Sequence, residues 1–177
     1  MTDCFQQSRA TILAITVMLL FVQVCSIPVS AANIDISVSG DIPQMVLTPG
    51  SSNQNSSVHL NVTSDTANWT VSVKDAMDGS KIPGTEGKMA NWSGSAYASS
   101  GNLAAALQVA GASIPTKTTG ADVTLSGSDQ PIETGLDVVT SLEIPLTFAQ
   151  VVAYTDPHLT VPNHVYRIVV TFTGTTT

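Results

Sequence analysis

The chain has 177 residues, 43% of them hydrophobic and 11% charged, with 13 acidic side chains against 6 basic ones. A net charge of −7 argues against a nucleic-acid or anionic membrane partner, because few cations are available to replace the counterions of phosphates. The length suits one domain of ordinary size.

The first 32 residues predict a secretory signal peptide. Arg9 precedes an apolar run over residues 10–22, and Pro28 and the small residues 30–32 follow. The run is short for a membrane-spanning helix, so we expect no span in the mature chain. Two alternatives stay open: a retained anchor, and cleavage after Ala10 as in archaeal type IV pilin precursors. A mature N-terminus at Thr11 would favour the pilin alternative.

Both cysteines, Cys4 and Cys25, lie inside the predicted signal peptide. The mature chain, residues 33–177, therefore has no disulfide, thiol nucleophile or zinc–thiolate site. A chain of this length buries about two thirds of its unfolded surface, so a single domain is stable without crosslinks.

Apolar residues alternate with polar ones from Ile34 onward, which is the period of a half-buried strand. Frequent turn residues separate the runs, and no long amphipathic helix is evident. The pattern predicts an all-β, antiparallel two-sheet β-sandwich, either Ig-like or a jelly roll. The expected strands cover residues 34–38, 45–48, 58–62, 69–73, 107–110, 123–125, 142–153 and 165–173.

Three segments need separate treatment. Pro145 cannot donate to a ladder, so its strand should be an edge strand or contain a bulge. Residues 103–107 could form one or two helical turns, which the sequence leaves open. Residues 75–101 are too long for a hairpin turn and are either a functional loop or a disordered insertion.

Three segments together carry a resemblance to a known type of protein. Trp69-Thr70-Val71-Ser72-Val73 follows a Val-Thr-Ser step, and an apolar-Thr-Val-Pro turn at residues 159–162 precedes a final strand led by Tyr166. This order resembles secreted β-sandwich surface proteins of bacteria and methanogenic archaea, including WxL-like domains. The Trp-x-Leu motif itself is absent here. The resemblance implies an extracellular or cell-surface location and a non-catalytic role.

Two groups of residues could bind a metal ion. Asp156, His158 and His164 offer a carboxylate and two imidazoles, a mixture that suits zinc, although two prolines also explain the segment as a rigid turn. Asp75 and Asp78, with Glu86 further on, are rich enough in oxygen for calcium, or they mark an ordinary turn.

Signs of catalysis are weak in this sequence. No Gly-x-Ser-x-Gly elbow is present. Asp122, Glu133, Asp137 and Glu143 could converge into the paired carboxylates of a glycoside hydrolase, but no motif supports this alternative. We therefore expect a protein that is not an enzyme.

Two aromatic residues and four asparagines complete the set of candidate sites. Trp92 and Tyr97 lie in a loop of small polar residues, where they could stack on a sugar or dock a partner, or Trp92 could fold back onto the sandwich. Acceptor sequons for N-glycosylation begin at Asn55, Asn61, Asn68 and Asn91.

Together these features predict an exported structural or adhesive module of the cell surface. Its partners would be other copies of itself, cell-surface proteins or glycans. Strand 34–38 lies close to the expected mature N-terminus and could complete a neighbour's sheet, which would build a filament by strand exchange. The alternative is a carbohydrate-binding module that uses Trp92 and Tyr97.

Overall fold

The fold is taken from a computed structural model, which describes residues 32–40, 45–79 and 81–177. The predicted signal peptide lies almost wholly outside these residues. Ala32–Thr177 form one compact unit. In the described part no helix is long and apolar enough to cross a membrane.

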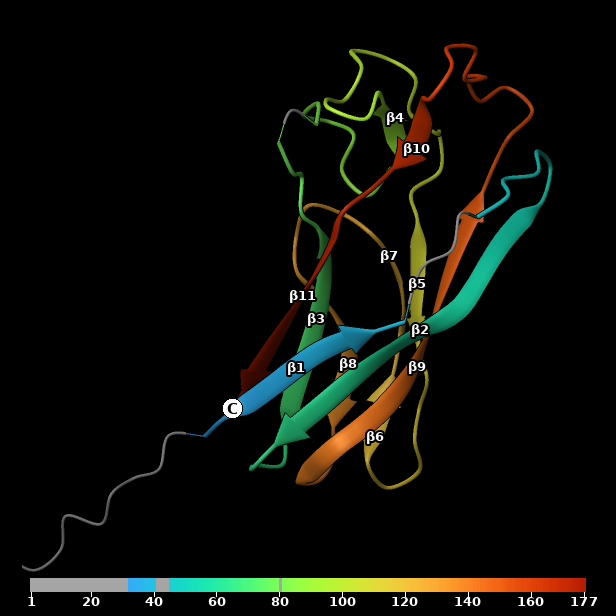
Figure 1. Ribbon diagram of the computed structural model, residues 1–177. Helices are drawn as coiled ribbons and strands as arrows, with labels where there is room; N and C mark the ends of the chain where they lie inside the picture. The colour runs from blue at the N-terminus through green and yellow to red at the C-terminus, as the bar shows by residue number, and fades with distance from the viewer. Residues whose placement is uncertain (1–31, 41–44, 80) are drawn as a thin grey trace, which may run out of the picture. The chain divides into compact units, whose positions relative to one another are not determined.

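The described unit is a β-sandwich of two antiparallel sheets, as the alternating pattern predicted (Figure 1). Five strands form the first sheet, in the order β1 (Ile34–Ser39), β2 (Ser52–Ser64), β9 (Val139–Val151), β5 (Gln108–Gly111) and β7 (Asp122–Thr124). Four form the second, in the order β11 (Val170–Thr176), β3 (Trp69–Asp75), β8 (Gln130–Gly135) and β6 (Thr118–Gly120). A short ladder of β10 (Val165–Arg167) and β4 (Ala90–Trp92) lies at one end.

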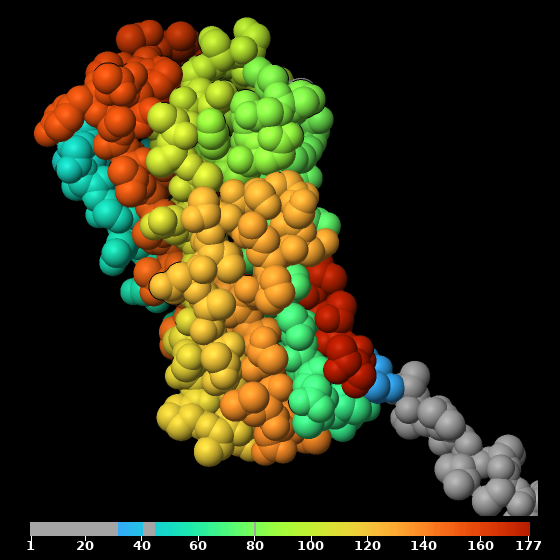
Figure 2. All heavy atoms as spheres, turned by 180° about the vertical axis from the view of Figure 1, so that it is seen from behind, coloured from blue at the N-terminus to red at the C-terminus, as the bar shows by residue number. Residues whose placement is uncertain are grey.

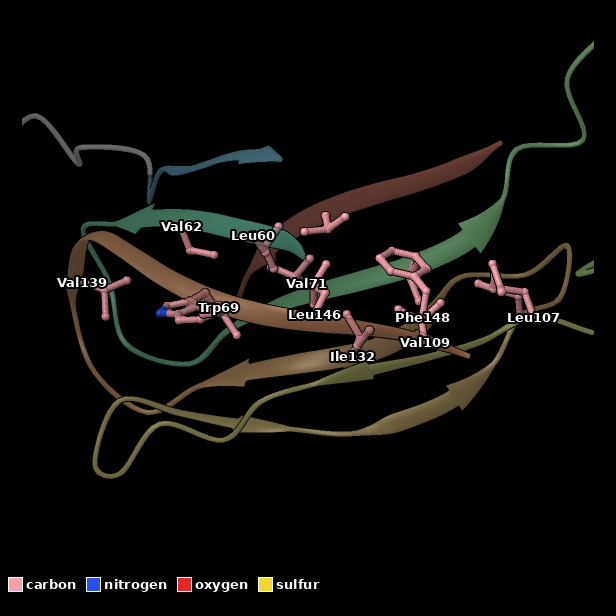
Figure 3. Close-up of a cluster of buried hydrophobic side chains, with 14 residues drawn as sticks. Leu60, Val62, Trp69, Val71, Leu107, Val109, Ile132, Val139, Leu146 and Phe148 are labelled. Atoms are coloured by element: carbon pink, nitrogen blue, oxygen red, sulfur yellow. The ribbon is translucent and has the colours of Figure 1, made fainter. Parts of the chain in front are cut away.

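The core lies between the two sheets and is built from the alternate apolar positions of long strands. Along β3, every second residue from Trp69 to Asp75 is buried, because successive side chains of a strand point to opposite faces. Leu60 and Val62 of β2 approach from the other sheet, and Figure 3 shows these side chains pointing into the same space. The fully buried Trp69 ring donates a hydrogen bond from Nε1 to the carbonyl of Asp137, 3.0 Å away.

Pro145 lies in an interior strand, so of the two predicted alternatives, an edge strand or a strand with a bulge, the structure has the irregular interior strand. β9 pairs with β2 on one side and with β5 on the other. The ladder between β5 and β9 ends at the Gly111–Leu146 pair, so no N–H is needed from Pro145 on this side. The carbonyl of Pro145 accepts a hydrogen bond from the N–H of Ala112 at 3.2 Å. The β2–β9 ladder also has two register irregularities, one on each side of Pro145.

Two expected strands differ from the structure. Residues 45–48 are not a strand, because the segment joins no ladder and turns back at Thr48, whose N–H donates to Asn53 Oδ1 at 2.8 Å. Residues 165–173 are divided between β10 and β11 by Ile168 and Val169, and the two halves pair with β4 and β3.

The described part of the long segment after β3 makes regular backbone pairings. It contains β4, and bridges join Trp92 to Tyr97 and Lys88 to Ala106. Residues 103–107 form no helical turn; Leu103 and Leu107 are buried, and their N–H groups donate to Met89 and Gly87. Figure 2 shows this part of the chain, in green to yellow, beside the orange-red segment that precedes β10.

Candidate functional site

Asp75 organises the loop that follows β3. Its carboxylate forms an ion pair with Lys81, and neither side chain is exposed to solvent. The same carboxylate accepts backbone N–H groups of Met77 at 3.0 Å and Gly87 at 2.8 Å. Gly87 has a φ of 76°, and a Cβ there would meet the carbonyl of Leu125 at 1.8 Å, so only glycine fits. Asp75 is therefore a structural clamp, and its oxygens are already occupied.

Asp78, the second expected calcium ligand, also has protein partners. Its carboxylate accepts a hydrogen bond from Tyr97 OH at 2.8 Å and lies 3.2 Å from Arg167 Nη2. Burial, together with this hydrogen bond, raises the pKa of Tyr97 to about 12. Glu86 instead accepts the N–H of Gly84 at 2.9 Å, and this backbone bond lowers its pKa.

Trp92 and Tyr97 are packed against each other rather than presented separately. Their ring centroids are 4.9 Å apart in an edge-to-face arrangement, and Tyr97 is buried. The guanidinium of Arg167 lies 4.3 Å from the Trp92 centroid and covers one face of that ring. Trp92 itself is half-buried, so part of its ring is covered by protein.

Each of the three expected zinc ligands has a different environment. The two oxygens of Asp156 accept N–H groups of Ala104 at 2.8 Å and Ala153 at 2.7 Å, so this carboxylate fastens two loops together. His164 Nδ1 donates to Asn91 Oδ1 at 2.7 Å, and His158 is exposed. Within residues 32–40, 45–79 and 81–177, no three His, Cys, Asp or Glu side chains gather closely enough to hold a metal ion.

The sequon asparagines differ in accessibility. Asn91 is half-buried and bonded to His164, while Asn61 is half-buried and donates from Nδ2 to Ser39 Oγ at 3.0 Å. Asn55 is also half-buried and accepts from Ser57. Asn68 is exposed in the turn between β2 and β3, so its amide is the most accessible of the four.

A carboxyl group whose burial the sequence did not predict lies between the sheets at the other edge of the sandwich. Glu133 of β8 is 1% exposed, and one of its oxygens accepts a hydrogen bond from Thr118 Oγ1 at 2.5 Å. The other oxygen has no protein partner and lies against Gly111 and Gly120. Burial raises the pKa of Glu133 to about 7. Glycines within the short strands of this edge are the sequence signal of such a close approach.

An apolar groove lies at one end of the sandwich. At this end the two sheets diverge, as the ribbon in Figure 1 shows. It has a volume of about 780 Å³. Its floor comes from Val58 and Phe148 of the first sheet, and its walls include Leu47, Val170 and Phe172. At the opposite end of the same edge, Ile34 of β1 packs against Gly174 of β11, which closes the sandwich there.

No family model, curated protein or solved structure matches this chain. The resemblance to WxL-like surface proteins therefore stays a prediction.

Proposed function

We propose that this protein is an exported, non-enzymatic module of the cell surface with a structural or adhesive role. The proposal rests on the different roles of two neighbouring groups of residues at one end of the sandwich. The acidic and aromatic side chains singled out for chemistry hold loops together there, whereas the apolar groove beside them offers surface to a partner. A large apolar concavity in a stable scaffold is typical of a binding site.

Export is supported by the sequence. The apolar run over residues 10–22 and the small residues before Asn33 have the pattern of a cleaved signal. β1 begins at Ile34, directly after the expected cleavage site, so processing would leave the whole sandwich intact.

Adhesion through sugars has weaker support. A carbohydrate-binding site needs an open aromatic face, and Arg167 covers a face of Trp92 while Tyr97 is buried. We therefore place the contact surface at the groove rather than at the aromatic pair.

Assembly by strand exchange is part of the same proposal. β1 pairs with β2 over residues Ile34–Ser39 in its own chain, so a copy that gives this strand to a neighbour must first release that ladder. Deleting residues 33–39 should abolish fibres and leave the domain folded if exchange drives assembly. Unchanged fibres would contradict this mode.

The location is tested by expressing the full chain in a host with an intact export pathway. We expect a mature N-terminus after Ala31 or Ala32 and release of the domain when intact cells are treated with protease. An unprocessed chain found only inside the cell would overturn the proposal. A start at Thr11 would instead indicate a retained, pilin-like helix.

A further inference from the structure

We propose that the apolar groove and its rim are a contact surface for a second copy of this chain. This inference deepens the proposed function, on which it rests, by naming the partner and the surface. It follows from the shape of this face, from its charge and from the open edge of one sheet.

The face carries projections beside the concavity. Val46 is 84% exposed and stands between Met45 and Leu47, which line the groove. Tyr154 is 80% exposed, follows the lining residue Ala153 and lies over Gly50. Exposed large apolar side chains next to an apolar concavity mark an interaction site.

A protein partner would cover both the groove and the exposed side chains beside it, whereas a small apolar ligand would cover the groove alone. A small molecule inside the groove would leave Val46 and Tyr154 in water. A surface that combines projections and a hollow on one side can contact a second copy of itself about a two-fold axis, so that each copy fills the groove of the other.

The distribution of charge also favours this face as the contact between copies. Copies with a net charge of −7 repel each other, so self-association requires a surface with little unpaired charge. Among the described residues that line the groove, two belong to the charged types Asp, Glu, Lys and Arg, namely Asp156 and Arg167. Asp156 is bonded to two backbone N–H groups and Arg167 is paired with Asp78. The groove therefore presents little net charge to the approaching copy.

The wall of the groove also offers backbone hydrogen bonds. β11 pairs with β3 on one side, and among the described residues no strand pairs with its other side. Its residues Val170 and Phe172 line the groove. An unpaired strand edge beside an apolar floor favours a polypeptide over a lipid, because only a polypeptide chain can continue the ladder.

Sedimentation-velocity ultracentrifugation over a range of concentrations tests the proposal. The sample is the domain purified after export, or the chain cut at a protease site placed before Ala32, since Ala32–Thr177 form a compact unit with its own core. We expect a reversible dimer that persists or strengthens as salt is raised, because salt screens the repulsion between copies. Dissociation by salt would contradict an apolar contact.

Two variants and a matched control locate the surface. Val46→Asp and Tyr154→Asp should each weaken the dimer at least about tenfold, since each introduces a charge into an apolar contact. Leu136→Asp changes a residue that is 53% exposed and adjoins Gly135 and the buried Trp69, far from the groove, and should leave the dimer unchanged. Circular dichroism checks that each variant is folded.

Three results would overturn the proposal. The first is a wild-type domain that stays monomeric at the highest concentration. The second is equal weakening of the dimer by the Leu136→Asp control. The third is native mass spectrometry that finds a bound amphiphile on a monomer, which would assign the groove to a small ligand. A domain that dimerises but is never exported would contradict the proposed location while leaving this inference standing.

Discussion

The carboxylate of Asp75 and the ammonium group of Lys81 meet inside the domain, where water reaches neither side chain. Removing one partner of such a pair leaves a buried charge uncompensated, which costs about 3–5 kcal/mol. We expect Lys81→Met to lower the free energy of unfolding by that amount in urea titrations. The loop that contains Trp92 should become more susceptible to protease, because the clamp at Asp75 also holds Gly87.

An exposed pair serves as the control for that experiment. Lys74 lies 2.9 Å from Asp129, with both side chains partly in solvent. Lys74→Met should cost less than about 1 kcal/mol, since surface ion pairs contribute little. Equal effects of the two substitutions would contradict the structural role of the buried pair.

Glu133 should make stability depend on pH. Burial raises its pKa to about 7, whereas the unfolded chain has the ordinary value of 4.5. Between these values the folded state holds a proton that the unfolded state has lost, so the stability contributed by Glu133 is fully present below pH 4.5 and is lost as pH rises towards 7. The fall attributable to Glu133 is roughly 3 kcal/mol at most.

Glu133→Gln isolates this contribution. The amide keeps the shape of the protonated carboxyl group and does not titrate, so the fall between pH 4.5 and 7 should be smaller in the variant. Thermal unfolding of both proteins across this range measures the difference, and the histidines are common to both. Parallel curves for the two proteins would refute the raised pKa.

Arg167 connects the aromatic pair to the loop after β3. It lies over the Trp92 ring and pairs with Asp78, and both side chains of that ion pair are about one third exposed. We expect Arg167→Gln to destabilise the domain by about 1–2 kcal/mol through loss of the cation–π contact and part of the ion pair. Urea unfolding followed by tryptophan fluorescence reports both the stability and the environment of Trp92. An unchanged fluorescence spectrum would show that the guanidinium does not cover the ring.

Gly135 allows the Trp69 ring to lie flat against β8. A Cβ at this position would fall 2.0 Å from a ring atom of Trp69, which is fully buried and hydrogen-bonded. Gly135→Ala should therefore destabilise the domain by about 1–3 kcal/mol or more, because a close-packed core cannot absorb an added methyl group there. Gly127→Ala is the control, since a methyl group there meets only the flexible side chain of Glu86 at 3.0 Å. A comparable loss from both substitutions would argue against close packing at Trp69.

Several elements could be predicted from the sequence for a simple physical reason. In β2 and β3 one face is buried and the other is more exposed to solvent. Apolar residues such as Leu60 and Val62, or Val71 and Val73, therefore alternate with polar ones in the residue order. The short strands β4, β6 and β8 lack a clear alternation and were missed. Glu133 was missed as a buried group because nothing in the residue order places Gly111 and Gly120 against it.

The candidate sites were less predictable than the strands. Asp75, Asp78 and Asp156 have the residue types of metal ligands, but the sequence does not show that Lys81, Arg167 and backbone N–H groups occupy their oxygens. Such partners come from distant parts of the chain and become visible only when the loops are placed side by side.

The sequence alone determined that this protein is an all-β sandwich, because the period of apolar residues is a local property of each strand. Only the tertiary structure decided which polar groups have hydrogen-bond or ion-pair partners in the protein and where an apolar surface stays open. The groove between β11 and the segment 45–49 exists because the two sheets diverge at one end, and divergence is a relation between strands that no single segment encodes.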